Sequence, residues 1–465
     1  MAPQTQTQTL QLPATSTLSF KVHRRQPELV SPAKPTPREV KLLSDMDDQQ
    51  GRVRTHLSLI FLYESKDYKS NDNKKRDPVE MIRKALAETL VYYYPFAGRL
   101  REGPDQKLVV DCNGEGVMFI EADADVALHE FGDDLLPPFP CLDELLFEVE
   151  GSTDILNSPL FHIQVTRLKC GGFIFALRLN HTMVDAVGLT LFLTTIGDMV
   201  RGAHAPSVHP VWDRHLLGAR VPARVTHAHR EYDMRESVAE ADNVQGSFFF
   251  GPSDISAIRR LLHPHQRERA TDFETLTSFI WRCRTAALRL HPNTEMRLQC
   301  VVNGRGKLKN PPLPPGYYGN VIVLPVAIST AKELVERPLG FALELVREAK
   351  SSATEDYFRS VADFLATTKN WAQPEGETLW LVSDLRRIGF ENVDLGFGKP
   401  LYGGLAKAGA KNLPGLSVYE RHKNKKGETG TAVLICLPAP AMERFEKEVK
   451  DALCVNPKYV INSML

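Results

Sequence analysis

The stretch 173–200, FIFALRLNHTMVDAVGLTLFLTTIGDMV, organises the chain, because its hydrophobic period changes once, at His181. Before His181, apolar residues alternate with mixed ones, and this period of two predicts a strand with one buried face and one mixed face. After His181, apolar residues recur at roughly helical spacing as far as Val200, which predicts a helix. A histidine at the junction of a strand and a helix lies at the edge of a sheet, where polar chemistry is easily placed.

Length and charge narrow the class of protein. The chain has 465 residues, enough for two or three domains with sizeable cores. Its 57 basic and 57 acidic side chains give zero formal net charge, and it reads as a soluble globular protein. Because nucleic acid and anionic membranes bind basic surfaces, we expect neither as the main partner. We also expect no membrane span, since no run approaches ~18 apolar residues.

The cysteines and the chain ends bear on the compartment. The seven cysteines are scattered without a CxxC pair, which favours buried free thiols in a reducing compartment. The first 16 or so residues are rich in Gln and Thr, so we expect them to be disordered and see no secretory signal. The final tripeptide Ser463-Met464-Leu465 is similar to the SKL-type peroxisomal address, which predicts a peroxisomal location, with the cytoplasm as the alternative.

Short strands and helices alternate in both halves of the chain, which predicts α/β or α+β layers. Asn113-Gly114, a favoured tight-turn pair, predicts a hairpin. We expect strands or hairpins at 18–22, 56–63, 107–111 with 116–121, 160–169 with 172–180, 246–250, 300–303, 379–384, 416–421 and 431–437. We expect helices at 81–91, 252–262, 272–290, 331–350, 358–370 and 441–453. The intervening stretch 202–226, rich in Pro, Ala, His and Arg, is typical of an inter-domain crossover.

His181 and Asp185 carry the first chemical signal. Histidine exchanges protons near neutrality because its unperturbed pKa is about 6.5. Asp185 lies one helical turn further on, so it either faces the imidazole or turns inward to an arginine and fixes the bend. On the HxxxD pattern alone a structural histidine is the commoner case. Two ligands do not make a zinc site.

A second motif makes a catalytic His181 more favoured than a structural one. Asp394 opens DLGFGKP (394–400), a glycine-punctuated loop roughly two hundred residues after HTMVD (181–185). Together the two motifs resemble the plant BAHD acyltransferases, which use acyl-coenzyme A. The resemblance extends over nearly the whole chain and includes YYYPFAGRL at 92–100, VVNGRGKLKNPPLPPGYYGN at 301–320 and LVSDLRRIGFENVDLGFGKP at 381–400.

The resemblance implies an α/β fold of two similar-sized mixed-sheet domains, as in chloramphenicol acetyltransferase, with the active-site channel between them. We place these domains at 1–201 and 236–465, joined by a long crossover at 202–235. It further implies a monomer that binds an acyl-coenzyme A and a small alcohol. We expect neither a permanently bound cofactor nor a metal.

Roles carry over residue by residue. The resemblance makes His181 the general base in the channel and pairs Asp185 structurally with Arg305. Asp394 is counted with His181 among the catalytic candidates, although its motif is expected to lie away from the channel and support the fold. Leu395 stands where the family usually has phenylalanine, which puts the local packing in question.

Further residues match family positions near coenzyme A or the reacting carbonyl. These are Thr271, Asp272, Asn303, Lys307 and Ser383, with Lys309 as a further phosphate contact. For each lysine the alternative is a solvated loop charge. Backbone amides or Ser383 are the candidate donors to the oxyanion.

Substrate class follows from the subgroup. The chain resembles most the alcohol acyltransferases that make volatile esters, benzyl alcohol O-benzoyltransferases in particular. We therefore expect direct transfer of a benzoyl group from benzoyl-coenzyme A to benzyl alcohol. The alternatives are acetyl or anthraniloyl donors with another small alcohol, or with a scaffold alcohol or amine. A serine hydrolase is disfavoured because no GxSxG elbow occurs, and a non-catalytic relative is disfavoured because His181 is present.

Overall fold

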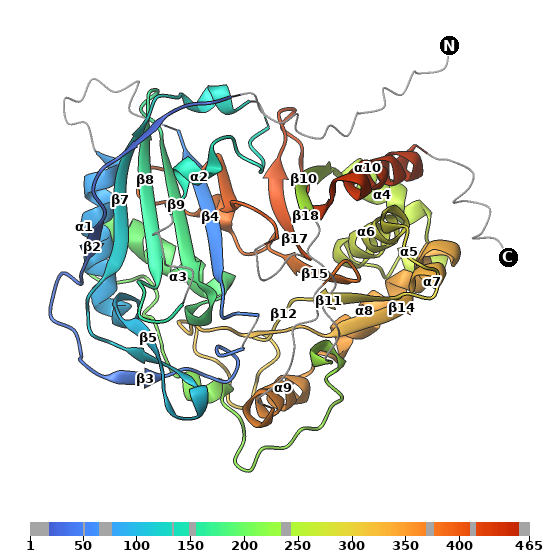
Figure 1. Cartoon of the computed structure of the whole chain (residues 1–465), viewed down its shortest axis with the longest axis horizontal. Coiled ribbons are helices and arrows are strands. Elements are labelled where there is room, and N and C mark those ends of the chain that lie inside the picture. Colours follow the sequence, from blue (N-terminus) through green and yellow to red (C-terminus); the bar gives the residue numbers. More distant parts are fainter. Residues whose placement is uncertain are drawn as a thin grey trace.

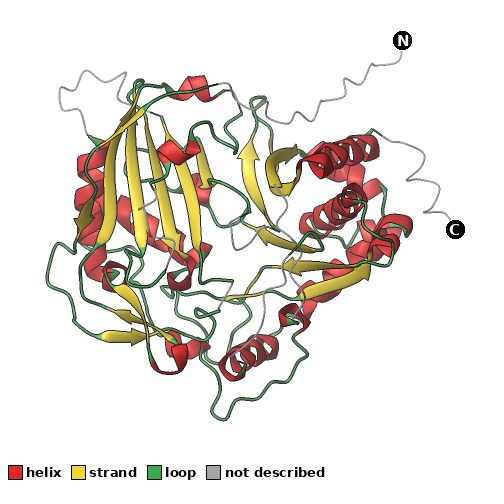
Figure 2. Ribbon diagram, viewed as in Figure 1, coloured by secondary structure: helices red, strands yellow, loops and turns green. Residues whose placement is uncertain are grey.

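Two large β-sheets lie side by side in the computed structural model, and most helices pack against them (Figure 1; Figure 2). The structure describes residues 18–49, 52–64, 77–132, 134–147, 155–233, 243–368, 376–409 and 415–454. The expected disordered N-terminus and the C-terminal tripeptide lie outside these residues. The mixed α/β architecture confirms the predicted fold class.

The first sheet is built almost wholly from the first half of the chain. Its order is β1-β7-β8-β9-β4-β16, and β2 also pairs with β7. The bounds are β1 Val22–Arg24, β2 Glu28–Val30, β4 His56–Tyr63, β7 Val117–Ala124, β8 Phe161–Leu168, β9 Phe173–Asn180 and β16 Tyr402–Leu405. Only β7 and β8 run parallel among these pairs of the described chain. The expected strand 56–63 and the β8–β9 hairpin are confirmed, whereas the expected strand 18–22 starts only at Val22.

Strand β9 is buried on both faces, so the prediction of one mixed face is wrong. Phe175 packs in the core beneath α1 (Pro78–Tyr92) and α3 (Ala186–Val200). Ile174 packs in a second cluster with residues around α2 (Leu142–Leu145). The chain before β8 thus covers the face that was expected to be mixed.

The second sheet comes from the second half. Its order is β10-β18-β17-β15-β11-β14. The bounds are β10 Asn243–Phe250, β11 Glu295–Cys300, β14 Val326–Thr330, β15 Leu379–Asp384, β17 Leu416–Lys423 and β18 Thr429–Pro438. One face packs against helices α4 (Pro252–Arg260), α6 (Asp272–Leu288), α8 (Leu339–Ser352) and α10 (Ala439–Leu453). The other face carries a smaller apolar cluster that reaches Leu405 of β16.

The expected 331–350 helix is two helices. α7 (Ala331–Glu336) ends before Pro338, because proline cannot donate the hydrogen bond that would continue a helix. α5 (Pro264–Arg267) is a single turn between α4 and α6. α9 (Glu355–Thr367) begins three residues earlier than predicted, because Thr354 caps it.

The predicted hairpin around Asn113-Gly114 is wrong. The strand before it, β6 (Leu108–Asp111), pairs with β3 (Val40–Leu42) and β5 (Arg99–Glu102) in a small separate sheet. The strand after it, β7, pairs in the large sheet. Gly114 does adopt a positive φ of 66°, but long-range pairing directs the two strands into different sheets. A second small sheet joins β12 (Val302–Asn303) to β13 (Ile322–Val323).

The crossover is folded against the body of the protein. Short 3-10 helices at Arg214–Leu217 and Arg230–Tyr232 anchor it. One strand, β16, crosses the expected domain boundary, because it follows residue 236 in sequence yet pairs with β4. The division at 201 and 235 stays a prediction, and β16 shows that the second half completes the first sheet.

Candidate active site

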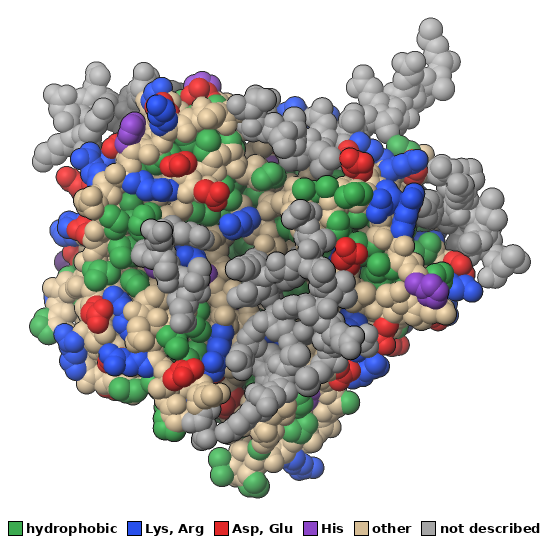
Figure 3. Space-filling view, viewed as in Figure 1, with side chains coloured by type: hydrophobic (Ala, Val, Ile, Leu, Met, Phe, Trp, Pro, Cys, Tyr) green, Lys and Arg blue, Asp and Glu red, His purple; other side chains and the backbone are tan. Residues whose placement is uncertain are grey.

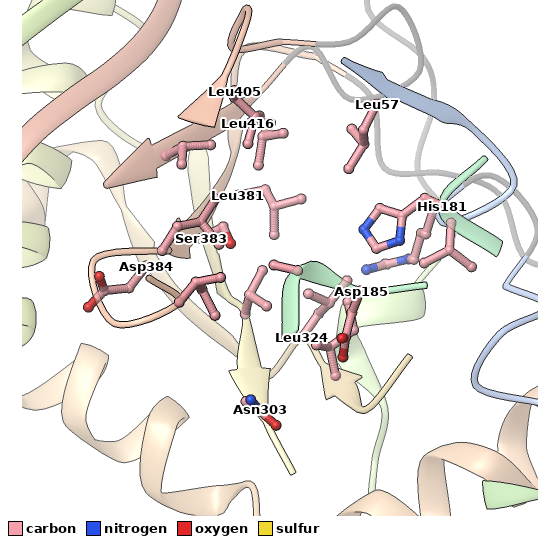
Figure 4. A pocket seen from close by; sticks show the side chains of 18 of the residues that line it. Leu57, His181, Asp185, Asn303, Leu324, Leu381, Ser383, Asp384, Leu405 and Leu416 are labelled. Carbon is pink, nitrogen blue, oxygen red and sulfur yellow. The ribbon is translucent and has the colours of Figure 1, made fainter. Parts of the chain in front are cut away.

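A cavity of about 180 Å³ lies between the two halves (Figure 4). The first half contributes Leu57, Leu179 and His181 to its wall, and the second sheet contributes Leu381 and Leu416. Since apolar side chains dominate the wall, charges inside it interact more strongly than they would in water. The cavity occupies the place of the expected channel between domains.

His181 stands where β9 ends. The side chain of Asn180 accepts from the N–H of Thr182 at 3.1 Å and caps a 3-10 turn over His181–Met183. The helix then starts with Asp185 as its N-cap, so a short turn separates the predicted strand from the predicted helix. The His181 N–H donates to the carbonyl of Thr55 at 2.9 Å, which ties the turn to the loop before β4. Figure 4 shows the ring pointing into the cavity.

Burial favours the neutral form of the His181 imidazole. Desolvation by the surrounding protein lowers its pKa below the ordinary 6.5, against smaller raising effects from the backbone of His181 itself, the charge of Asp185 and the side chain of Asn320. Its Nδ1 atom is buried, and within the described residues no acceptor meets it with good hydrogen-bond geometry. A neutral imidazole in an apolar cavity can take a proton from an alcohol near neutral pH.

Asp185 makes its hydrogen bonds to Arg305 rather than to the imidazole. Its two carboxylate oxygens accept from two guanidinium nitrogens at 2.6 and 3.0 Å. They also accept from the backbone N–H groups of Gly188 and Val321 at 3.0 and 3.1 Å. With the carboxylate only 5% exposed, these partners fix the start of α3 against a loop of the second half. Of the two alternatives left open by the sequence, the inward one is observed.

The residues expected near coenzyme A separate into two groups. Asn303 and Ser383 line the cavity. The residues outside its lining are Thr271, Asp272, Lys307 and Lys309. Thr271 is the N-cap of α6, and Asp272 forms an ion pair with Arg259 at 2.7 Å. Contacts of all these residues with coenzyme A stay predictions.

Asp394 lies at the opposite end of α3 from His181. Its Oδ1 accepts from the N–H groups of Gly396 and Gly398, both at 2.8 Å. Its carbonyl accepts from Arg201, the residue that ends α3, at 3.0 Å. At about 1.5 Å per residue, a 15-residue helix places its two ends ~22 Å apart. The carboxylate of Asp394 closes its own loop, and Asp394 is not among the residues that line the cavity. This position does not favour a catalytic role, which stays a prediction.

Leu395, which stands where the family usually has phenylalanine, packs well in its loop. The side chain is fully buried in the apolar core beneath α3. Phe397 meets Phe173 edge to face, with ring centroids 5.1 Å apart. Leucine therefore fills an apolar site in this loop without touching the cavity.

Two polar residues of the cavity wall carry no sequence signal. Arg52 donates to Gln299 at 3.0 Å across the two halves, and its guanidinium lies 4.5 Å from the ring centre of Tyr232. Burial lowers the pKa of Arg52. An arginine in a loop and a glutamine in a strand belong to no motif, so only the folded chain reveals that they meet.

A Ser360–His229–Glu231 array has the spacings of a hydrolase triad. Nε2 of His229 lies 2.8 Å from the Ser360 hydroxyl, and Nδ1 lies 2.9 Å from Glu231. All three side chains are buried, and the hydroxyl also accepts from the N–H of Thr226 at 2.9 Å. The array joins the crossover to α9 and gives the serine no open approach, so it does not support hydrolysis.

Other classes of site find little support in the described part of the chain. There, no helix is long and apolar enough to cross a membrane. No three His, Cys, Asp or Glu side chains of the same residues are grouped to hold a metal ion. Basic and acidic side chains are interspersed on the face shown in Figure 3.

Comparison with known proteins extends over nearly the whole chain. The model of a family described as the Transferase family matches residues 20–452. The (Z)-3-hexen-1-ol acetyltransferase of Arabidopsis thaliana is 57% identical over 95% of this chain and 97% of its own length. The benzyl alcohol O-benzoyltransferase of Nicotiana tabacum is 55% identical over 95% of each chain.

Solved structures share the fold at low sequence identity. Vinorine synthase superposes with a TM-score of 0.68 at 20% identity, over 91% of this chain and 96% of its own. F. sporotrichioides TRI101, complexed with Coenzyme A and T-2, gives a TM-score of 0.68 at 15% identity over 91% and 98%. The matched length and the identity to these relatives lead to one conclusion: the chain belongs to the Transferase family, the BAHD acyltransferases, which transfer acyl groups from acyl-coenzyme A.

Proposed function

We propose that this alcohol O-acyltransferase takes benzoyl-coenzyme A as donor and benzyl alcohol as acceptor, forming benzyl benzoate. The observation that carries the proposal is His181 in an apolar cavity between the two halves. The relatives named for benzyl alcohol O-benzoyl transfer are 55% and 54% identical to this chain.

The reaction is a direct transfer. The alcohol oxygen attacks the thioester carbonyl while His181 takes the hydroxyl proton. The carbon–sulfur bond then breaks, and the imidazolium returns that proton to the coenzyme A thiolate. Donor and acceptor become ester and free thiol, and the histidine ends as it began. No acyl-enzyme is formed, so a serine or cysteine nucleophile is not needed.

The tetrahedral intermediate carries an oxyanion that needs hydrogen-bond donors. Ser383 is our candidate, because it lies on β15 in the cavity wall (Figure 4). The candidate contacts for coenzyme A are Thr271, Asp272, Asn303, Lys307 and Lys309, on the second-half side. Asp185 and Arg305 hold the bend that aims His181.

Acetyl-coenzyme A with an aliphatic alcohol is the second candidate pair of substrates. The 57% identity to (Z)-3-hexen-1-ol acetyltransferase favours it. The apolar wall suits a C6 chain as well as a benzyl ring, since neither offers a charge to pair. A bulky scaffold acceptor is less favoured, because about 180 Å³ is below the ~300–1,000 Å³ of drug-sized sites.

The test is an assay of purified protein with benzoyl- and acetyl-coenzyme A against benzyl alcohol, (Z)-3-hexen-1-ol and other small alcohols. The proposal predicts the highest kcat/KM for benzoyl-coenzyme A with benzyl alcohol. A clear preference for acetyl-coenzyme A would replace it with the second candidate. Loss of the thioester without any ester product would contradict alcohol acyl transfer altogether.

We further propose that the protein acts as a monomer in peroxisomes. The location rests on Ser463-Met464-Leu465, which is similar to the SKL-type peroxisomal address. A fluorescent fusion that leaves this terminus free should be punctate, and a diffuse cytosolic signal would contradict the location. Gel filtration at the mass of a dimer would contradict the monomer.

A further inference from the structure

Two buried side chains donate hydrogen bonds to the backbone carbonyls of the turn that carries His181. Nδ2 of Asn320 donates to the carbonyl of His181 at 2.8 Å and to that of Thr182 at 3.3 Å. Arg214 donates to the next carbonyl, that of Met183, at 2.8 Å. Three successive carbonyls of the turn therefore have fixed partners, and none of these bonds involves the Asp185–Arg305 pair.

Asp47 joins the two side chains. Its Oδ1 accepts from Arg214 at 2.7 Å, and from the backbone and side-chain nitrogens of Asn320 at 2.8 and 3.0 Å. Asp47, Arg214 and Asn320 come from the N-terminal half, the crossover and the second half, and none is more than 2% exposed. We call these three residues the rear cluster.

The backbone at Gly319 lies close to the Arg214 guanidinium of the rear cluster. A methyl group at Gly319 would overlap the Arg214 guanidinium, so only glycine leaves room for it. The guanidinium also lies over the rings of Trp212 and Tyr318, 4.4 and 5.0 Å from their centres. Because a buried ion pair adds little net stability over apolar residues of the same volume, its distinguishing property here is the geometry that it fixes.

The amide of Asn320 lies beside the turn that carries the imidazole. Three oxygens, from Asp47, His181 and Thr182, face its nitrogen, which fixes which end of the amide is Nδ2. Its Oδ1 is buried and, like Nδ1 of His181, has no well-aligned partner among the described residues. Asn320 lies close enough to favour the protonated ring.

We propose that the rear cluster positions His181 for catalysis, with the Asn320 amide oxygen accepting from Nδ1–H so that Nε2 is presented to the substrate alcohol. This rests on the proposed role of His181 as base. When the alcohol proton reaches Nε2, the ring becomes a cation with two N–H donors, and Asn320 supplies an acceptor for the one that faces the protein.

The other charges around the ring must stay constant in any test. Asp185 and Arg305 flank it from α3 and the second-half loop, and Arg52 lines the same cavity. Asp47 and Arg214 lie behind it as an ion pair whose two charges cancel. Exchanging Asn320 for alanine changes none of these charges.

The experiment compares Asn320→Ala and Asn320→Asp with wild type, using Asn293→Ala on an exposed loop as the matched control. For Asn320→Ala we expect kcat per folded molecule to fall about 10- to 100-fold with KM for the acyl-coenzyme A within about threefold, because a small misplacement of a reacting group is costly. The acid limb of the kcat/KM profile should move to lower pH in Asn320→Ala and to higher pH in Asn320→Asp. Asn293→Ala should match wild type.

A purely structural role would lower the folded fraction in urea titrations and leave both the acid limb and kcat per folded molecule unchanged, and that result would overturn the proposal. If Asn320→Asp fails to fold, the alanine variant alone still decides it. His181→Ala keeps the two claims apart. Full activity in that variant would remove His181 as base, whereas an inactive His181→Ala beside an unaffected Asn320→Ala would remove only the rear cluster.

Discussion

Helix α3 carries an aspartate–arginine contact at each end, and the two contacts differ in burial and geometry. At the start of the helix, Asp185 and Arg305 meet at 2.6 Å with side chains 5% and 20% exposed. At its end, Asp394 and Arg201 are 3.7 Å apart and 40% and 43% exposed. The first joins the two halves beside the cavity, and the second closes a surface loop.

The difference in burial between the two contacts indicates which of them fixes the position of neighbouring groups. A buried, bidentate pair fixes direction as well as distance, whereas an exposed pair at 3.7 Å is screened by water and contributes little. Both motifs identify the family, yet only the one at the start of α3 lies beside a group that can move a proton.

The largest effect is expected for Asp185→Asn, which removes the charge of Asp185 from its pair with Arg305. The amide keeps the shape but leaves the half-buried Arg305 without its counter-charge, so we expect a loss of about 3 kcal/mol in the free energy of unfolding, the low end for a broken buried pair. We also expect kcat per folded molecule to fall, since the turn that carries His181 loses its anchor. Urea unfolding and initial rates measure both. A loss below about 1 kcal/mol would make the two ends of α3 alike.

A third carboxyl, Glu420 on β17, extends the comparison to β16, the strand that follows the Asp394 loop. Glu420 accepts from the N–H of Leu405 at 2.7 Å and lies 2.7 Å from the hydroxyl of Tyr402. That hydroxyl also lies 2.8 Å from the Leu405 carbonyl, and its single proton can serve only one acceptor. A protonated Glu420 completes the set, and burial raises its pKa to about 7.

The sign of the pH effect follows from this pKa. Because it is raised from 4.5, the folded state binds the proton more tightly than the unfolded state, so Glu420 destabilises the fold as pH rises through 4.5 toward 7 and above. Glu420→Gln keeps the hydrogen bonds without a charge. Its stability relative to wild type should increase by roughly 2 kcal/mol between pH 5.5 and 8 in urea titrations. An offset independent of pH would show that Glu420 is ionised in the fold.

Gly197→Ala tests the far end of α3 through packing. A methyl group there would overlap the carbonyl of Asp394, so the helix and loop must separate. We expect a loss of about 1–3 kcal/mol in unfolding free energy with kcat per folded molecule nearly unchanged. Gly306→Ala is the control for stability, because nothing lies within 4 Å of its added carbon. Equal stability of the two variants would mean that the loop does not rest on α3 in solution.

The smallest effect is expected for Asp394→Ala. Two backbone N–H groups lose their acceptor, but the site is open enough for water to replace it, so about 1 kcal/mol should be lost. Thermal unfolding and kcat measure the outcome. A kcat that falls more than tenfold per folded molecule would support a catalytic role for Asp394.

What the sequence could predict follows from the range of the interactions. The sequence placed β4, β9 and α3 well, because apolar runs and the spacing of apolar residues are signals contained within a single element. It misplaced the partner of β7 and gave no sign of β16 in the first sheet, since strand pairing is decided by residues far apart in sequence.

The site shows the same limit. His181 and Asp185 can be found in the sequence, because the hydrophobic period changes from that of a strand to that of a helix at HTMVD. Arg52, Gln299 and Asp47 belong to no motif and meet their partners only across the fold. The resemblance found the pairing of Asp185 with Arg305. It could not decide whether Asp394 reacts or supports the fold, because membership of a motif does not tell a reacting residue from a supporting one.

The roles of His181 and Asp394 are separated by measuring kcat per folded molecule for His181→Ala and Asp394→Asn, side by side with the same acyl-coenzyme A and alcohol. The assignment of His181 as base and Asp394 as a supporting residue predicts a fall in kcat of about 10²- to 10⁴-fold for His181→Ala, the range for a lost general base, with wild-type stability. It predicts that Asp394→Asn keeps kcat within about threefold, because a residue away from the reacting atoms removes no transition-state contact. A His181→Ala variant with wild-type turnover, or an equal collapse of kcat in both variants, would contradict it.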